Sequence, residues 1–292
     1  PIIVFAGDHG IAAQGVSAYP QEVTIAMMAN FASGGAAISV LAREIGSRLE
    51  VVDAGSLAAL PLPGIIADKP RCGSRDFSRC AALEPEDVSF AFSCGKRAVE
   101  RTAVDRPDLL ILGEMGIGNT TSAAAIAASL LELPATAMAG SGTGLDAAGR
   151  ARKAAISDAA LDRHGLRDTT PSPERTLEAV GGLEVSALCG AIISAAQTGL
   201  PVLVDGFIVS VAALAAVRLI PSCRPYLIFS HKSAEGGHRH VLDALEAKPL
   251  LELDLRLGEG SGAALALPLL RLACALHNGM ATFAEAAVPD RA

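Results

Sequence analysis

The feature that most constrains the fold is a regular alternation of two kinds of segment. Short runs of β-branched or aliphatic residues end in Gly-rich or acidic loops, and Ala-rich stretches of helical length lie between them. This pattern is typical of βα units whose strands pair in parallel. The predicted strands, all buried on both faces, are Ile2–Phe5, Leu49–Asp53, Leu109–Leu112, Pro201–Asp205 and Leu227–Phe229. The predicted helices are Pro20–Arg43, Thr121–Leu131, Asp146–His164, Leu183–Thr198 and Ile208–Leu219.

The composition indicates a core of small aliphatic side chains. Hydrophobic residues make up 51% of the 292 residues, whereas aromatic residues make up 3% and Trp is absent. The interior must therefore be filled by Ala, Leu, Val and Ile, which favours close packing of helices onto a sheet. The length suits one large α/β domain with a minor appendage. From Gly262 onward the chain is helical in character, and we expect it to leave the sheet as part of a small lobe.

The charge and cysteine content exclude several classes of protein. A formal net charge of −7 argues against nucleic acid as a partner, because such binding draws most of its affinity from Lys and Arg. The six cysteines form no C-x-x-C pair, which predicts reduced thiols in a cytoplasmic protein.

The stretch from Glu184 to Asp205 is uncharged between these two residues and long enough to span a bilayer. Gly199 and Pro201 interrupt it, so we expect a helix followed by a buried strand.

Function is expected in the loops that follow the strands, because ligands of open parallel sheets bind at the carboxyl ends of the strands. Two Gly-rich loops, Gly113–Thr121 and Gly140–Asp146, open onto helices and allow backbone N–H groups to approach a phosphate. Neither has the Lys of a Walker loop. Each taken alone is equally compatible with a helix cap or a tight turn. Three further unusual loops are Ala6–Gly10, Asp205–Phe207 together with Ser230–Glu235, and Leu257–Gly262.

Two carboxylates and a histidine cluster are the candidates for chemistry. Glu114 and Glu259 each stand beside Gly residues after a predicted strand, where a base or a ligand clamp would explain them. The alternative is a carboxylate stabilised by the dipole of the following helix, worth roughly 0.3–1 kcal/mol. A metal site would need His231, His238 and His240 with Glu235 and Glu246, but H-x-H spacing is weak evidence. Asp8 and His9 could pair, yet no nucleophile elbow supports a hydrolase triad.

Six segments taken in order resemble the nicotinate-nucleotide:dimethylbenzimidazole phosphoribosyltransferase family. The first is V-F-A-G-D-H-G-I-A-A-Q-G-V-S-A-Y-P-Q-E-V-T, and the second is G-E-M-G-I-G-N-T-T. The others are G-T-G-L-D, G-L-P-V-L-V-D-G-F, R-P-Y-L-I-F-S-H-K-S-A-E and R-L-G-E-G-S-G-A-A-L-A. The resemblance spans nearly the whole chain, and L-G-E-G-S-G is its most specific segment.

This resemblance implies a Rossmann-like parallel sheet flanked by helices, a small helical lobe built from both chain ends, and a homodimer. Residues 1–260 would form the α/β nucleotide-binding domain and residues 261–292 part of the lobe. Family members usually begin with some tens of further residues, which include a helix and a G-S-L-G-R-L-E-like segment. The family uses no metal or other cofactor. V-L-V-D-G-F also differs from the two-acid motif of transferases that use phosphoribosyl pyrophosphate and Mg²⁺.

The implied reaction displaces nicotinate from C1′ of nicotinate mononucleotide by a ring nitrogen of 5,6-dimethylbenzimidazole, with inversion from β to α. The product is α-ribazole 5′-phosphate, the lower-ligand nucleotide of cobalamin. By motif match Glu259 is the base and Glu114 its acidic partner. Further residues implied by the match would line the base pocket (Tyr19, Met27 and Leu257), hold the phosphate (Gly116, Gly142, Gly206 and Ser233) and bind the ribose hydroxyls (Asp205).

Two other functions are compatible with the same residues. One is a nucleotide-binding sensor on this scaffold that lacks turnover. The other is a metal-dependent hydrolase that uses Asp8, His9 and the cluster from His231 to His240. The sequence leaves open which heterocyclic base is preferred, because an aliphatic pocket discriminates poorly among similar flat rings.

Overall fold

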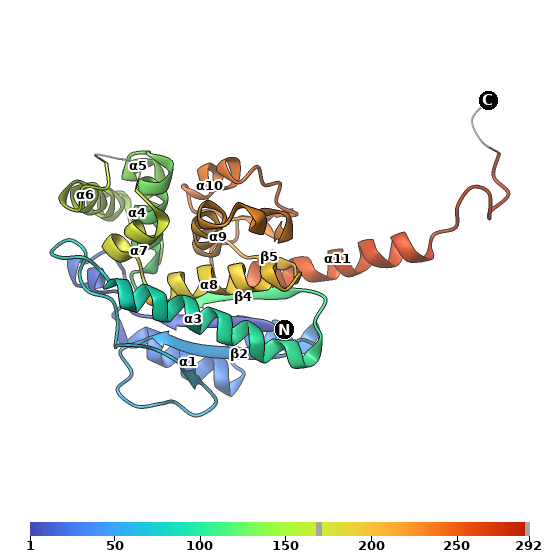
Figure 1. The fold of residues 1–292 in the computed structure, drawn as a ribbon, viewed down its shortest axis with the longest axis horizontal. Helices are drawn as coiled ribbons and strands as arrows, with labels where there is room; N and C mark the ends of the chain where they lie inside the picture. The colour runs from blue at the N-terminus through green and yellow to red at the C-terminus, as the bar shows by residue number, and fades with distance from the viewer. Residues whose placement is uncertain (168–170, 290–292) are drawn as a thin grey trace.

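The five aliphatic runs predicted to be strands all lie in one parallel sheet (Figure 1). The computed structural model describes residues 1–167 and 171–289. The sheet has six strands in the order β3-β2-β1-β4-β5-β6. The strands are β1 (Ile2–Gly7), β2 (Leu49–Gly55), β3 (Ile66–Ala67), β4 (Leu110–Met115), β5 (Val202–Val204) and β6 (Leu227–Phe229). A separate pair consists of β7 (His231–Lys232) and β8 (Leu251–Glu252). The α/β prediction is confirmed.

The strand order changes direction between β1 and β4. From β1 the chain runs outward to β2 and β3, and it then returns to place β4 on the other side of β1. Ligands of open α/β sheets bind outside the carboxyl ends of the strands at such a point. Phe5 of β1 pairs with Glu114 of β4, so this carboxylate lies where the topology predicts a ligand.

Both faces of the sheet are covered, as its aliphatic strands require. Along β1, Ile3 and Phe5 face one core cluster, whereas Ile2, Val4 and Ala6 face the other. The first face is covered by α3 (Pro85–Thr102), α4 (Asn119–Leu131), α8 (Leu183–Gln197) and α9 (Phe207–Leu219). The second is covered by α1 (Glu22–Ser33), α2 (Ala37–Glu44) and the start of α11 (Ser261–Gly279).

Small residues allow the helices of the first layer to approach closely. A Cβ atom at Gly95 of α3 would collide with the backbone of Ala187 in α8, and one at Gly190 of α8 would collide with Phe92. The remaining helices are α5 (Ala135–Met138), α6 (Ala147–Arg163), α7 (Pro173–Val180) and α10 (His238–Ala244). Three short 3₁₀ segments are η1 (Gly10–Gln14), η2 (Ala103–Asp105) and η3 (Pro221–Tyr226).

Four of the five predicted helices are confirmed as α4, α6, α8 and α9, and one prediction was wrong. The stretch Pro20–Arg43 is not a single helix but the separate helices α1 and α2. Gly34 ends α1 in the left-handed conformation, with φ 87°. At Gly35 a Cβ would collide with the Asn30 side-chain oxygen, so a larger residue there would have to displace that side chain. The chain therefore turns at this Gly pair.

The two long apolar stretches take different forms in the fold. The uncharged stretch between Glu184 and Asp205 divides into α8 and the central strand β5, as predicted. Among the described residues, Glu22–Glu44 alone has the length and composition of a membrane span. It forms two helices of 12 and 8 residues, each shorter than the roughly 20 residues that a span needs.

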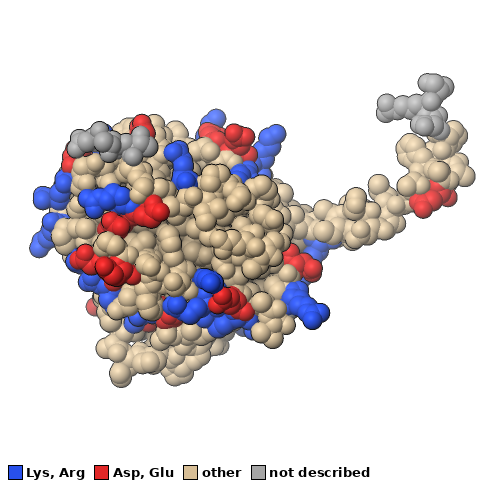
Figure 2. Space-filling view, in the orientation of Figure 1, with Lys and Arg blue, Asp and Glu red and all other residues tan. Residues whose placement is uncertain are grey.

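Helix α11 begins against the sheet and then projects away from it (Figure 1). Ala263, Ala264 and Ala266 are buried, whereas Leu272 and Leu276 are 61% and 63% exposed. The projecting part carries few charged side chains on the face shown in Figure 2. The proposed division at residue 260 stays a prediction, and residues 290–292 of the expected lobe lie outside the described part of the chain.

Candidate active site

Glu114 and Glu259 lie together at the switch point of the sheet. Glu114 belongs to β4 itself rather than to the loop after it, and its carboxylate accepts a hydrogen bond from the Asn119 side chain at the start of α4. The backbone N–H of Glu259 donates to the Glu114 carbonyl oxygen at 3.3 Å. A Cβ at Gly113 would collide with the Glu259 backbone, so this Gly allows the two segments to touch.

The Glu259 backbone is held in a conformation that few residues adopt. Its φ is 65°, between 86° at Gly258 and 82° at Gly260. The left-handed region costs a residue with a side chain about 1–2 kcal/mol, and such strain persists where surrounding contacts fix it. The carboxylate Oε2 accepts the backbone N–H of Ile38 at 3.2 Å. These contacts give the Glu259 side chain a defined direction.

The environment raises the pKa of both carboxyl groups. Burial raises the pKa of Glu114 to about 8, and the negative charges of Asp205 and Glu184 act in the same direction. The hydrogen bond from Asn119 opposes this effect. Burial also raises the pKa of Glu259, against the opposing effect of the Ile38 N–H. Glu114 is therefore largely protonated at pH 7 and can donate a hydrogen bond.

The two Gly-rich loops predicted to bind phosphate converge. Gly142 stands next to the first turn of α4, because a Cβ there would lie 2.7 Å from Thr120 Oγ1. The backbone N–H of Gly142 donates to Glu235 Oε1 at 2.8 Å. Lys153 is fully buried and donates to Thr120 Oγ1 at 2.8 Å. A cation, two loops and a helix N-terminus thus meet in one place.

A second group of contacts connects the convergence of the two Gly-rich loops to the segments that follow β5 and β6. Ser233 Oγ accepts the backbone N–H of Glu235 at 3.3 Å, and the Ser233 N–H donates to His238 Nδ1 at 2.8 Å. Gly206 begins α9 beside Ser233, since a Cβ at Gly206 would lie 3.6 Å from the Ser233 Cβ. Burial lowers the pKa of His238 to about 3, so its ring is neutral and can accept this N–H.

Comparisons with known proteins show which family the chain is similar to. A phosphoribosyltransferase family profile matches residues 1–288. The nicotinate-nucleotide–dimethylbenzimidazole phosphoribosyltransferase of Bradyrhizobium diazoefficiens is 71% identical over 291 residues, which cover 100% of this chain and 83% of that protein. The protein of the same description from Pseudomonas aeruginosa strain PAO1 is 57% identical, with 99% and 82% covered. A crystal structure of the Thermus thermophilus phosphoribosyltransferase of this kind has a TM-score of 0.93 and 43% identity, covering 99% of this chain and 86% of that one.

The chain belongs to the nicotinate-nucleotide–dimethylbenzimidazole phosphoribosyltransferase family. Of the residues that the sequence proposed for this transferase site, seven make hydrogen bonds or close contacts at this edge of the sheet. They are Glu114, Glu259, Gly116, Gly142, Asp205, Gly206 and Ser233. Gly116 follows β4 and packs against the carbonyl oxygen of Gly7, where a Cβ would collide. Asp205 accepts backbone N–H groups from the start of α11.

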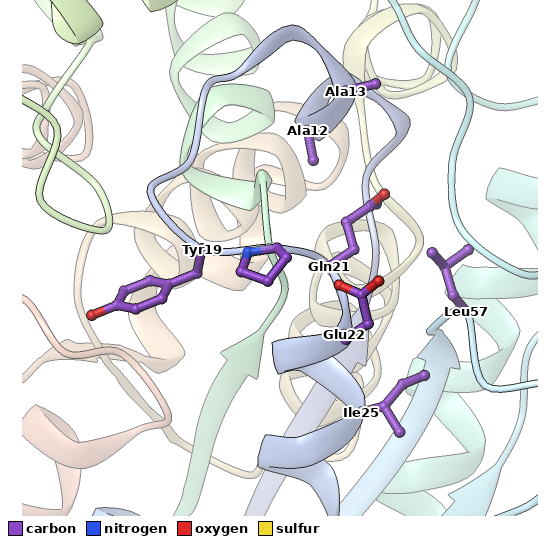
Figure 3. A pocket seen from close by; sticks show the side chains of 8 residues that line it. Ala12, Ala13, Tyr19, Gln21, Glu22, Ile25 and Leu57 are labelled. Carbon is purple, nitrogen blue, oxygen red and sulfur yellow. The ribbon is translucent and has the colours of Figure 1, made fainter.

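The three residues proposed for the base pocket do not take part in the contacts around Glu114 and Glu259 described above. Tyr19 and Leu257 are 56% and 62% exposed, while Met27 is half-buried against the second core cluster. Tyr19 and Leu57 line a hollow of about 450 Å³, with the Tyr19 ring directed away from Leu57 (Figure 3). Neither Glu114 nor Glu259 lines this hollow. The assignment of these three residues in the transferase stays a prediction.

One pairing suggested by the sequence was wrong. His9 does not pair with Asp8 but with Glu184, through Nε2 and Oε1 at 2.6 Å. Asp8 instead accepts the Thr24 hydroxyl at 2.7 Å and the backbone N–H of Leu57 at 2.9 Å. His9 and Glu184 are 175 residues apart in sequence, so local spacing could not reveal their contact.

Sequence reasoning also missed Lys153, and it did not settle the histidine cluster. Lys153 lies in a helix where charged residues are usually exposed, and nothing in its spacing marks it as buried. Burial lowers its pKa to about 8, and the Glu235 carboxylate opposes the change. Across residues 1–167 and 171–289, no group of three or more His, Cys, Asp or Glu side chains is arranged to hold a metal ion.

Proposed function

We propose that the protein transfers the 5-phosphoribosyl group of nicotinate mononucleotide to 5,6-dimethylbenzimidazole. The products are α-ribazole 5′-phosphate and nicotinate, in the pathway that makes cobalamin. Membership of the family supports the reaction class. The observation that supports this chemistry most strongly is the contact of Glu259 with Glu114 at the switch point, where two carboxyl groups have raised pKa values.

The reaction needs one base. The departing pyridinium already carries positive charge and leaves as neutral ring nitrogen, so it requires no protonation. The attacking benzimidazole uses one ring nitrogen at C1′ and must lose the proton on the other. A carboxylate within hydrogen-bond reach can accept that proton. We assign this role to Glu259, whose raised pKa makes it a stronger base than an exposed Glu.

Glu114 has a different role because it holds its own proton at neutral pH. A protonated carboxyl group beside Glu259 adds no second negative charge to the site. A neutral Glu114 therefore does not repel the negative charge that Glu259 carries when it acts as the base. Asn119 fixes the direction of the Glu114 side chain through its hydrogen bond.

The phosphate would bind where the two Gly-rich loops converge. The N-termini of α4 and α9 lie beside Gly116 and Gly206, and such termini attract anions. Ser233 offers a hydroxyl group, and Lys153 adds the positive charge that the loops lack. Because the Gly142 N–H already donates to Glu235, the contribution of Gly142 is to leave space beside Thr120.

The partners we propose are the two small-molecule substrates and a second copy of the chain. Basic and acidic side chains alternate on the face shown in Figure 2, which does not favour nucleic acid. The exposed apolar side chains of α11 support a homodimer. We propose a cytoplasmic location without membrane attachment, since all six cysteines are free and Glu22–Glu44 is divided between two short helices.

The proposal is tested by incubating the purified protein with nicotinate mononucleotide and 5,6-dimethylbenzimidazole and identifying the products by mass. We expect equal amounts of α-ribazole 5′-phosphate and nicotinate. A parallel set of benzimidazoles and purines establishes which base is preferred. Calorimetric binding of the nucleotide without any product would instead support a sensor that lacks turnover.

A further inference from the structure

We infer that Asp205 is a positioning residue for Glu259, which it acts on through the backbone at the start of α11. The sequence suggested a direct contact between Asp205 and the ribose hydroxyls. The structure points to a different role, which rests on the proposed function because it assumes that Glu259 is the base.

Asp205 supplies the cap that α11 does not have in its own sequence. The residue before the helix is Gly260, which has no side chain to accept an N–H group. Asp205 follows β5, and its Oδ2 accepts the Gly260 N–H at 3.1 Å, while Oδ1 accepts the Ala263 N–H at 3.0 Å. A carboxylate at a helix N-terminus satisfies unpaired donors and interacts favourably with the helix dipole.

One of these hydrogen bonds holds Gly260, the residue directly after Glu259, and the other holds Ala263 in the first turn of α11. The three residues Gly258, Glu259 and Gly260 are all left-handed, so small backbone rotations there would turn the Glu259 side chain. On its other side the loop contacts β4 through the 3.3 Å bond from the Glu259 N–H to the Glu114 carbonyl and through the close approach of Gly113, while the Ile38 N–H holds the carboxylate itself. Asp205 is therefore a principal restraint on the direction of the base.

The surroundings of Asp205 also leave little room for a ribose. Its side chain is 1% exposed, and His231 lies beside it with Nδ1 3.7 Å from Oδ1. His231 packs against the first turn of α11 at Gly262, where a Cβ would collide with the imidazole ring. A ribose hydroxyl would have to displace this packing or a backbone N–H to reach the carboxylate.

The test uses Asp205→Asn, which is nearly isosteric but replaces one acceptor oxygen with an NH₂ group. We expect kcat to fall about 10- to 100-fold, since displacement of a reacting group by about 1 Å costs roughly that much. The KM and the calorimetric Kd for nicotinate mononucleotide should stay within about twofold. A ribose ligand would give the opposite division, with a raised KM and a nearly normal kcat.

A double-mutant comparison separates an effect through Glu259 from a general loss of structure. In a Glu259→Gln background, Asp205→Asn should cost little further turnover, because the base that it positions is already absent. An equal loss in both backgrounds would overturn the inference. The matched control is Asp53→Asn, since Asp53 is another buried carboxylate near the carboxyl end of a strand, β2, and accepts the Gly55 and Ser56 N–H groups at 3.2 and 2.7 Å. It should lower the melting temperature without changing kcat.

The outcomes distinguish this inference from the proposed function. An inactive wild-type protein would remove the proposed function itself, whereas an active wild type with a fully active Asp205→Asn variant would remove only the role of Asp205. If Asp205→Asn does not fold, Asp205→Glu keeps both acceptor oxygens on a side chain longer by one methylene group. A lower kcat with unchanged nucleotide affinity in that variant supports positioning, and an unchanged kcat overturns it.

Discussion

Replacement of Glu114 by Gln tests whether this buried carboxyl group holds a proton in the folded protein. The pKa of Glu114 is raised from 4.5 to about 8, mainly by burial. Because the folded state binds this proton more tightly, the stability that it contributes is complete below about pH 4.5 and is lost as the pH rises through about 8. At about 1.36 kcal/mol for each pH unit, the upper value of that loss is about 5 kcal/mol.

A Gln side chain is neutral at every pH and keeps the shape of the protonated acid. Between about pH 5 and pH 8.5 the wild type should therefore lose up to several kcal/mol of unfolding free energy that Glu114→Gln keeps. The variant should become more stable relative to wild type as the pH rises. Urea denaturation of both proteins at the two pH values measures the difference. If the difference between the proteins is the same at both values, Glu114 is ionised in the folded state and the reasoning is wrong.

Three further predictions concern the loops, the chemistry and the oligomer. Gly142→Val should weaken calorimetric binding of nicotinate mononucleotide by at least about tenfold, or roughly 1.4 kcal/mol, because its side chain would displace Thr120. Gly144→Val is the control, because Gly144 also has a positive φ but a Cβ there would have no neighbour within 4 Å. If the two variants bind the nucleotide with equal affinity, Gly142 is only part of a turn. Turnover should survive exhaustive chelation, because the pyridinium leaves without a Lewis acid. Loss of turnover with EDTA and its recovery with Mg²⁺ would contradict this. Leu272→Arg combined with Leu276→Arg should shift the protein toward monomer in sedimentation. An unchanged mass would exclude these two exposed leucines of α11 from the dimer interface.

The sheet could be predicted from the sequence because its strands are continuous aliphatic runs buried on both faces. Strand β3 has only two residues and therefore no readable pattern. Helix α3 was missed although its start is marked, since Pro85 occupies the first turn and Glu84 and Asp87 form a reciprocal capping box. The break between α1 and α2 was also readable in the pair Gly34–Gly35.

The site was predictable where Gly residues mark a close approach of backbones. Gly113 and Gly260 identify the contact of β4 with the loop that carries Glu259. The sequence could not show that Lys153 is buried or that Asp205 caps a helix 55 residues later, since both depend on how distant segments pack. Such contacts carry no local spacing signal, and they decide which acids remain free to act on a substrate.

The central claim is that Glu259 accepts the benzimidazole proton, and kcat of Glu259→Gln measures it most directly. Gln has nearly the same size, can still accept the Ile38 N–H through its amide oxygen, and cannot take up a proton at neutral pH. General-base catalysis typically contributes 10²–10⁴-fold, so kcat should fall by about that factor while nucleotide affinity stays nearly unchanged. The same substitution at Glu114 should cost less. A Glu259→Gln protein with normal kcat and a lowered melting temperature would show that Glu259 only stabilises the loop before α11, and it would contradict the mechanism.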